Sequence, residues 1–371
     1  MGKRQSILLL CLSLLLTSLS GCGAGNSAAG DDAHYIPVFG CLGETGSVYE
    51  ANGILYYTDY ATGENGVLCS KPNCIHEPYS SSNTEPYCEA ALPNGNLSVS
   101  LLSGNSLYVM TTDFTGTEIY TKQVYGETWV KLLEIPYGFS SGLQRRIYDK
   151  KLYFTVASYE HETDITGEEM PALQSFPFLI EVDLDRRTYR TLTEYEDGSS
   201  CTDVLFIEGD SLYYETEYPI RDTYETTYRV CIYSLNLNTL ESEYLFTTDA
   251  SHVFLGAHEG TVYTCGTAGL MMLTEDGTWL PACQTDTCTS GYSYEDGILL
   301  SVRQDNSASI LHYDYKTGKV SDVPALPQNG YLFDVMGDWV LAITENGDIA
   351  AVPIEDLLSG RAQYTATWRP Y

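Results

Sequence analysis

The sequence predicts an all-β fold, a seven-bladed β-propeller made of four-stranded antiparallel blades. The main observation is a repeated pattern, a small turn residue followed at once by an apolar and aromatic strand, which occurs seven times in the 371 residues. The composition agrees, because the chain has 31 tyrosines but only 19 lysines and arginines. No long apolar stripe has the 3.6-residue period of a helix, so strands are favoured throughout.

The N-terminal residues 1–21 form the first element and have the layout of a secretory signal. A positively charged start precedes the apolar run 7–16, which is too short to span a bilayer. The run leads into Leu-Ser-Gly-Cys at 19–22, which resembles the processing box of bacterial lipoprotein precursors. This resemblance implies cleavage before Cys22 and anchoring by acyl chains, such as palmitate, on Cys22. The alternative is an ordinary secretory leader followed by a chance cysteine.

Residues 22–33 follow as a lipidated cysteine and a flexible tether of small and polar residues, and 34–371 are expected to form the propeller. The predicted location is therefore the extracytoplasmic face of the cell membrane, with the lipid bilayer as one partner. A formal net charge of −31 repels phosphate backbones, so nucleic acid is not an expected partner.

The repeated pattern is clearest as GDSLYYETE at 209–217, where a turn leads directly into a strand. Between successive copies the chain supplies a further pair of strands, so each unit is expected to have four strands. Uneven spacing of the copies indicates that certain loops vary on a constant scaffold, and it leaves six or eight blades open. Two separate β-sandwiches are the alternative fold. The blades are expected near 46–93, 97–136, 143–197, 203–249, 252–286, 291–327 and 331–371.

The copy Leu-Tyr-Tyr-Thr-Asp at 55–59 resembles the Tyr-Trp-Thr-Asp repeat of receptor-type propellers. The whole chain after the leader more closely resembles the DUF5050-like propeller lipoproteins of gut Firmicutes. This resemblance implies a fold and a membrane location, and it implies little about an activity.

Two long loops, at 157–177 and 215–227, are expected to lie side by side on the face that carries the connections between second and third strands. The turns on the other face are short, and ligands usually bind at variable loops on a rigid frame. Aromatic and acidic side chains suit sugars, cationic peptides or amines. The alternative is a solvated insertion without a partner, in which His161 is an exposed histidine and not a base. The candidate ligand-binding residues are Tyr159, His161, Glu162, Glu217, Tyr218, Arg221 and Tyr224.

The first blade contains the spacing Cys69, Cys74, His76 and Cys88. Pro-Asn at 72–73 can turn the chain so that the first two thiols meet, and an extended segment would point Cys74 and His76 the same way. Three thiolates and one imidazole complete a structural zinc shell. Disulfides among these cysteines, with Cys41 as a further candidate, and free thiols stay open as alternatives. An iron–sulfur cluster normally needs four cysteine ligands, and Cys41 would have to be the fourth. The segment resembles one in the similar propeller lipoproteins, which implies that it acts as a unit.

Cys283 and Cys288 flank a short loop and are candidates for a disulfide.

No G-x-S-x-G, P-loop or H-E-x-x-H motif occurs in the sequence. The favoured function is therefore a non-catalytic, membrane-anchored propeller that binds a ligand or a protein partner at the cell surface. The alternatives are an extracellular hydrolase or lyase acting on glycans, and a scaffold subunit of an envelope complex.

Overall fold

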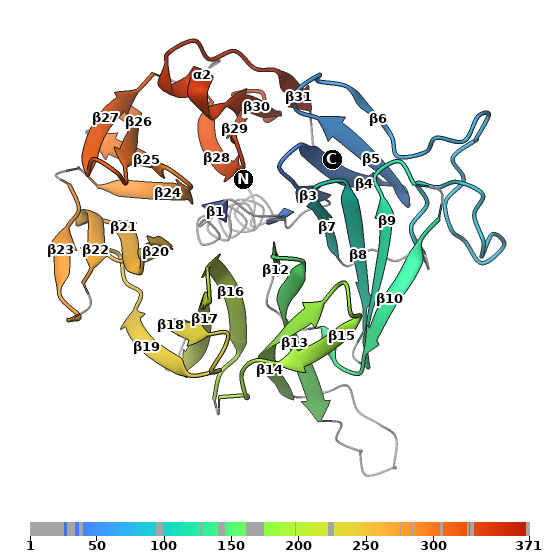
Figure 1. The fold of residues 1–371 in the computed structure, drawn as a ribbon, viewed down its shortest axis with the longest axis horizontal. Helices are drawn as coiled ribbons and strands as arrows, with labels where there is room; N and C mark the ends of the chain where they lie inside the picture. The colour runs from blue at the N-terminus through green and yellow to red at the C-terminus, as the bar shows by residue number, and fades with distance from the viewer. Residues whose placement is uncertain are drawn as a thin grey trace, which may run out of the picture.

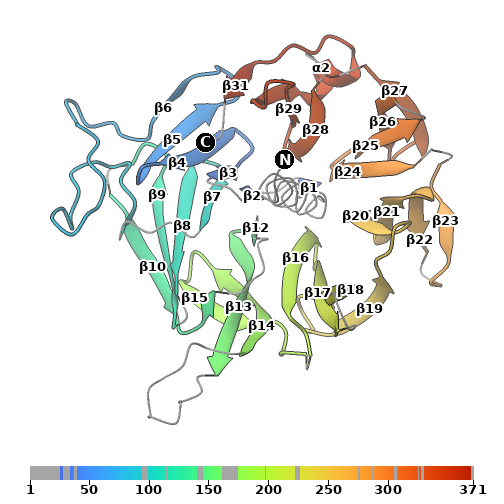
Figure 2. The same cartoon turned by 180° about the vertical axis from the view of Figure 1, so that it is seen from behind.

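The fold is a ring of seven antiparallel β-sheets (Figures 1 and 2). The computed structural model describes residues 26–27, 34–36, 40–93, 99–113, 115–126, 128–139, 145–160, 174–196, 198–221, 226–274, 276–283, 285, 287–304, 307–324, 326 and 330–368. Within these residues the one α-helix is short, so the predicted all-β, seven-bladed propeller is confirmed.

The first three blades lie next to one another in chain order (Figure 1). Blade one contains β2 (His34–Ile36), β3 (Gly40–Leu42), β4 (Gly46–Ala51), β5 (Ile54–Asp59) and β6 (Asn65–Val67). Blade two contains β7 (Val99–Ser103), β8 (Ser106–Thr112), β9 (Thr117–Gln123) and β10 (Val130–Ile135). Blade three contains β11 (Gly138–Phe139), β12 (Arg145–Tyr148), β13 (Lys151–Glu160), β14 (Gln174–Asp183) and β15 (Thr188–Thr191).

The remaining four blades complete the ring. Blade four contains β16 (Cys201–Glu208), β17 (Ser211–Arg221), β18 (Thr226–Asn236) and β19 (Ser242–Thr247). Blade five contains β20 (Val253–His258), β21 (Thr261–Gly266), β22 (Gly269–Leu273) and β23 (Trp279–Pro281). Blade six contains β24 (Cys288–Tyr294), β25 (Gly297–Gln304), β26 (Ser307–Asp314) and β27 (Lys319–Val323), with β1 (Asn26–Ser27) pairing parallel to β24. Blade seven contains β28 (Tyr331–Met336), β29 (Trp339–Ile343), β30 (Ile349–Pro353) and β31 (Ala366–Trp368).

The repeated pattern marks the hairpin between the first and second strands in blades two to seven. Gly104, Gly209 and Gly337 have φ angles of 51°, 55° and 52° in these hairpins, a left-handed conformation that glycine adopts without strain. Because each blade is an antiparallel meander, its first–second and third–fourth turns open on one face of the ring. We call this the hairpin face. The second–third connections and the links between blades open on the opposite face.

Blade one differs from the prediction, because it begins before residue 46. The turn at 43–45 joins β3 to β4 and lies beside the β28–β29 hairpin of blade seven, so β3 is the first of its four ring strands. Gly53 therefore lies in the second–third turn of this blade and not in the first hairpin. The pattern was misassigned because a strand and a tight turn look alike in sequence at either position.

The ring closes by side-chain packing in the described part of the chain, since blade one and blade seven each use strands from one end of the sequence. Leu42 and Tyr60 of blade one pack with Met336, Leu341 and Ile349 of blade seven in one buried cluster. Similar clusters fill the other contacts between blades, for example the one formed by blades three and four.

The helix α2 (Ile354–Leu358) is an exception to the prediction of short turns on the hairpin face. It stands between β30 and β31, where the chain needs 12 residues to pass from Pro353 to Ala366. Ile354 and Leu357 are buried against the sheet, and Glu355 and Asp356 lie in the first turn, where a negative charge is favourable.

Candidate functional site

The predicted metal ligands of blade one come together in the structure. Cys69, Cys74, His76 and Cys88 each offer one ligand atom, and these atoms all lie within 4.8 Å of one another. The four residues belong to the segment 68–92, which projects from the rim of the ring between β6 and β7 (Figure 1). We call this the rim segment. The spacing in the sequence therefore predicted a true spatial cluster.

The backbone reaches this arrangement by two residues in the left-handed conformation. Asn73 has a φ of 59°, which forms the turn predicted between Cys69 and Cys74. His76 has a φ of 54°, so the segment is not extended at His76 as predicted, although Cys74 and His76 both contribute to the cluster. The turn at His76 instead brings its Nδ1 to 3.4 Å from the Sγ of Cys88.

Hydrogen bonds join the two ends of the rim segment beneath the cluster. The Glu89 carboxylate accepts from the backbone N–H of Ser70 at 2.8 Å and from its hydroxyl at 2.9 Å. Burial opposes ionisation of Glu89, but these two hydrogen bonds and the charges of Lys122 and Lys71 together lower the pKa of the carboxyl. Lys71 donates to the Tyr87 carbonyl at 2.8 Å, with its ammonium 4.3 Å from the centre of the Tyr87 ring.

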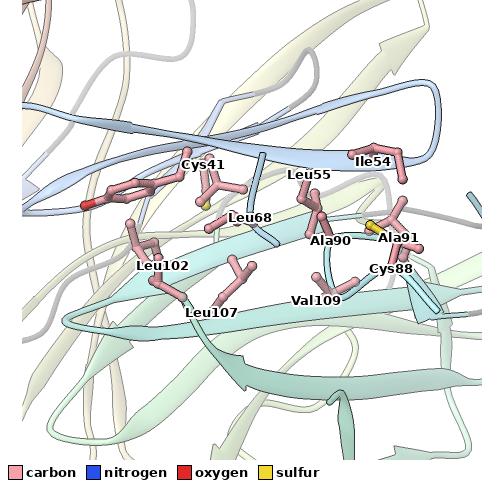
Figure 3. Packing of buried hydrophobic residues seen from close by; sticks show 14 residues of the cluster. Cys41, Ile54, Leu55, Leu68, Cys88, Ala90, Ala91, Leu102, Leu107 and Val109 are labelled. Atoms are coloured by element: carbon pink, nitrogen blue, oxygen red, sulfur yellow. The ribbon is translucent and has the colours of Figure 1, made fainter. Parts of the chain in front are cut away.

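Lys122 of blade two lies at the base of the cluster, and sequence reasoning missed it. Its ammonium donates to the carbonyl oxygen of Glu89 at 2.7 Å and to that of Leu68 at 3.4 Å, and the residue is 4% exposed. Nothing in the local sequence of β9 marks this lysine, because its partners come from the neighbouring blade. Close by, Cys88 and Ala91 pack on Ile54 and Val109 (Figure 3).

The other cysteines do not join this cluster. Cys41 is fully buried in β3, burial raises the pKa of its thiol to about 12, and it is not among the four residues that converge. The disulfide predicted between Cys283 and Cys288 stays a prediction. Burial, and then the charge of Cys288, raises the pKa of the Cys283 thiol to about 11.

The predicted ligand-binding loops of blades three and four are shorter than expected. Tyr159 pairs with Ser175 inside the β13–β14 ladder, and Glu217 and Tyr218 pair with Val230 and Arg229 inside the β17–β18 ladder. These three residues lie in strands and not in loops, because both hairpins continue past the point where the apolar pattern ends. His161, Glu162 and Tyr224 lie outside the described residues, as does the side chain of Arg221.

Three carboxyl groups of blade four, one buried and two partly buried, lie next to one another on β16 and β17. Asp203 is directly opposite Glu215 in the β16–β17 ladder, and Glu217 follows on the same side of β17. Burial, and then the charges of Asp203 and Glu217, raises the pKa of Glu215 to about 8. Burial also raises the pKa of Glu217. Of these three, only Glu217 was predicted from the sequence as a site residue, because burial depends on the fold.

Two cavities open on the hairpin face, opposite to the predicted loops. A cavity of about 790 Å³ lies between blades three and four and is lined by charges of both signs, among them Lys151, Glu181 and Arg190. Its charges are largely engaged with one another, since Arg190 forms two hydrogen bonds to Glu181, at 2.9 and 2.8 Å.

The second cavity, of about 860 Å³, lies where blades six, seven and one meet, and we call it the acidic cavity. Its walls include the aromatic rings of Tyr294, His312 and Trp339 and a single lysine, Lys316. The Tyr294 hydroxyl is 2.7 Å from the Nε2 atom of His312. Burial lowers the pKa of His312, so this ring is neutral at pH 7. The carboxylates of the lining are Glu44, Glu295, Asp296, Asp314, Asp338 and Glu355.

The leader, Cys22 and most of the tether lie outside the described residues. Among the helices that the structure describes, none is long and apolar enough to cross a membrane.

No protein-family model and no curated protein matches this sequence. Solved propeller structures resemble it at low identity. The β-propeller domain of the Trilobed protease from Pyrococcus furiosus is 12% identical, with a TM-score of 0.47 over 91% of this chain and 97% of that domain. Porphyromonas gingivalis dipeptidyl peptidase 4 is 10% identical, with a TM-score of 0.47 over 95% of this chain, which spans 60% of the peptidase. TolB from Acinetobacter baumannii is 14% identical, with a TM-score of 0.37 over 87% of this chain and 80% of TolB. These likenesses concern the fold alone.

Proposed function

We propose that this protein is a membrane-anchored extracytoplasmic lipoprotein whose propeller is a non-catalytic binding module for a cationic ligand. The acidic cavity is the observation that carries the binding role. The Leu-Ser-Gly-Cys box at 19–22 supports the anchor, because it follows a short apolar run and places the cysteine where acylation would occur.

The lining of the acidic cavity favours a positively charged ligand. Six carboxylates face one ammonium group, and that group, on Lys316, lies 2.6 Å from Asp296. A concave surface with such an excess of negative charge concentrates cations and repels anions. The negative potential of the cavity does not attract neutral sugars.

The aromatic side chains add selectivity for organic cations over metal ions. Trp339 and Tyr294 border the cavity, and the faces of such rings attract ammonium and guanidinium groups. Trp339 is held in place by Tyr60 of blade one, with ring centres 5.7 Å apart. A polyamine or a lysine-rich peptide therefore fits the chemistry of this site. Of the sugars, cationic peptides and amines expected from loop composition, the cavity favours the cationic ligands.

A titration with spermidine tests the binding role. We expect saturable binding that weakens at high salt and falls at least tenfold when Asp338 and Glu355, both exposed, are changed to Asn and Gln. The matched control changes Glu241 and Glu243 to Gln on the exposed edge of blade four, with an equal loss of charge. If both variants bound spermidine with equal affinity, the loss of binding would come from net charge alone, and the cavity would not be the binding site.

A glycan-acting enzyme is the second candidate, and the carboxyl groups of blade four favour it. Glu215 is held protonated at neutral pH by burial, close to Asp203 and Glu217, and a protonated carboxyl beside other carboxyls is the arrangement of an acid–base pair. Release of reducing ends from polysaccharides, abolished by Glu217→Gln without loss of folding, would establish this function in place of pure binding.

A further inference from the structure

We propose that Cys69, Cys74, His76 and Cys88 bind one zinc ion in a closed four-ligand shell, and that this ion fastens the rim segment to blades one and two. The proposal is independent of the acidic cavity and of any ligand there. It rests on the donor set, the packing of the donor atoms, the structure of the rim segment and the position of Lys122.

The donor atoms fit a zinc ion closely. With Zn–S bonds of about 2.3 Å, neighbouring ligand atoms in a tetrahedral shell are about 3.8 Å apart. The four donors here already lie within 4.8 Å of one another, and His76 Nδ1 is 3.4 Å from Cys88 Sγ. Small side-chain rotations therefore complete the shell. Three sulfurs and one nitrogen leave no open position for a substrate, so the ion is structural.

Apart from the proposed zinc ion, few interactions hold the outer part of the rim segment in place. Its residues form only isolated bridges, between Ser80 and Asn83 and between Ile54 and Ala91, and no described strand or helix. Ile75, between two of the ligands, is 77% exposed, and Tyr87 is 65% exposed. Long segments without regular structure are uncommon in compact domains. Where a small core contributes too little stability, a metal or another cross-link stabilises the fold.

A disulfide explains the convergence of these four side chains less well than a metal does. It would join two of the sulfurs and leave the third thiol and the imidazole of His76 without a role in the same small volume. A zinc ion uses all four groups, and three thiolates with one imidazole give the centre a net charge of −1.

Lys122 supplies a compensating positive charge for that centre. Its ammonium is held by the carbonyls of Leu68 and Glu89, the residues immediately before Cys69 and immediately after Cys88. Groups that hold the backbone next to the ligands fix the ligand geometry in metal sites. Because Lys122 belongs to β9, the same contact ties the metal centre of blade one to blade two.

Metal analysis of the purified full-length protein tests the proposal. We expect about one zinc per chain by mass spectrometry of the metals, and loss of at least nine-tenths of it in Cys74→Ser. Cys283→Ser, a cysteine on blade five outside the cluster, is the matched control and keeps the metal. Cobalt added to the metal-depleted wild-type protein should give the charge-transfer absorption of thiolate ligands and the visible bands of tetrahedral cobalt.

The cobalt spectrum keeps the test decisive if Cys74→Ser fails to fold, since it uses the wild-type chain. Two results would overturn the proposal. One is wild-type protein that contains no stoichiometric metal and gives no thiolate–cobalt band after reduction. The other is peptide mapping that finds Cys69, Cys74 or Cys88 in a disulfide in the freshly isolated protein, where the zinc site requires all three to react as thiols once the metal is removed.

Discussion

Leu341 is the residue at which closure of the ring can be tested most sharply. Its side chain is fully buried in β29 and packs in the cluster that joins blade seven to Leu42 and Tyr60 of blade one. Leu341→Ala removes three carbon atoms from this contact. The neighbouring Ala351 and Ala366 are small and lie on the sheet of blade seven, so they cannot fill the space.

The expected loss in unfolding free energy is about 3–5 kcal/mol, the upper part of the range for buried leucines. About 4 kcal/mol corresponds to a roughly thousandfold larger population of the opened ring. Because no strand is exchanged between the first and last blades of the described chain, we expect the loss to appear as local opening at this contact.

Hydrogen exchange followed by mass spectrometry measures this opening. In Leu341→Ala, peptides from β3–β5 and β28–β30 should lose protection while those of blades three and four keep it. Leu179→Ala, at an equally buried site between blades three and four, should cost a similar free energy and open its own contact. Uniform loss of protection in both variants, or no loss in blades one and seven, would refute closure by side-chain packing.

Three further predictions follow from the site and the leader. A chelator should lower the midpoint of thermal unfolding of the wild-type protein and leave that of His76→Ala unchanged, since the variant has already lost the metal; an equal shift in both proteins would contradict the zinc site. Folding raises the pKa of Glu215 from 4.5 to about 8, so the folded state holds a proton that the unfolded chain releases, and stability to urea should fall as the pH rises from 5 to 8. Glu215→Gln should flatten this dependence, and an unchanged slope would show that Glu215 does not cause it. Cys22→Ser should move the protein from the detergent phase to the aqueous phase on Triton X-114 partition, whereas a protein anchored in another way would stay in the detergent phase.

Much of the fold could be predicted because its repeating unit is local. A glycine hairpin and the strand after it, as at Gly209, need only the sequence around them, so six of the seven first hairpins were located correctly. The Gly53 turn was assigned to the wrong pair of strands, although Gly-Ser-Val-Tyr at 46–49, directly after the turn at 43–45, has the same pattern as Gly-Thr-Val-Tyr at 260–263. The two turns are only a few residues apart, and both lead into strands that contain tyrosine. The cluster around Cys69 and Cys74 was predicted for the same reason, since its ligands are close in sequence.

The missed features depend on contacts between segments that are distant in the sequence. Lys122 is buried because blade one offers carbonyl oxygens to it. The acidic cavity joins Glu44 to Trp339, almost 300 residues further along the chain, and it exists only once the ring is closed. The strand pattern also gives no sign of where a hairpin ends, so Tyr218 was expected in a loop and lies in β17.

A structure of the protein crystallised with spermidine tests the central claim most directly, because it shows where a cationic ligand binds. We expect ligand density between Trp339 and the carboxylates of Asp338 and Glu355, on the hairpin face. Density confined to the opposite face near the connections of blades three and four, or an acidic cavity that stays empty at saturating spermidine, would contradict it.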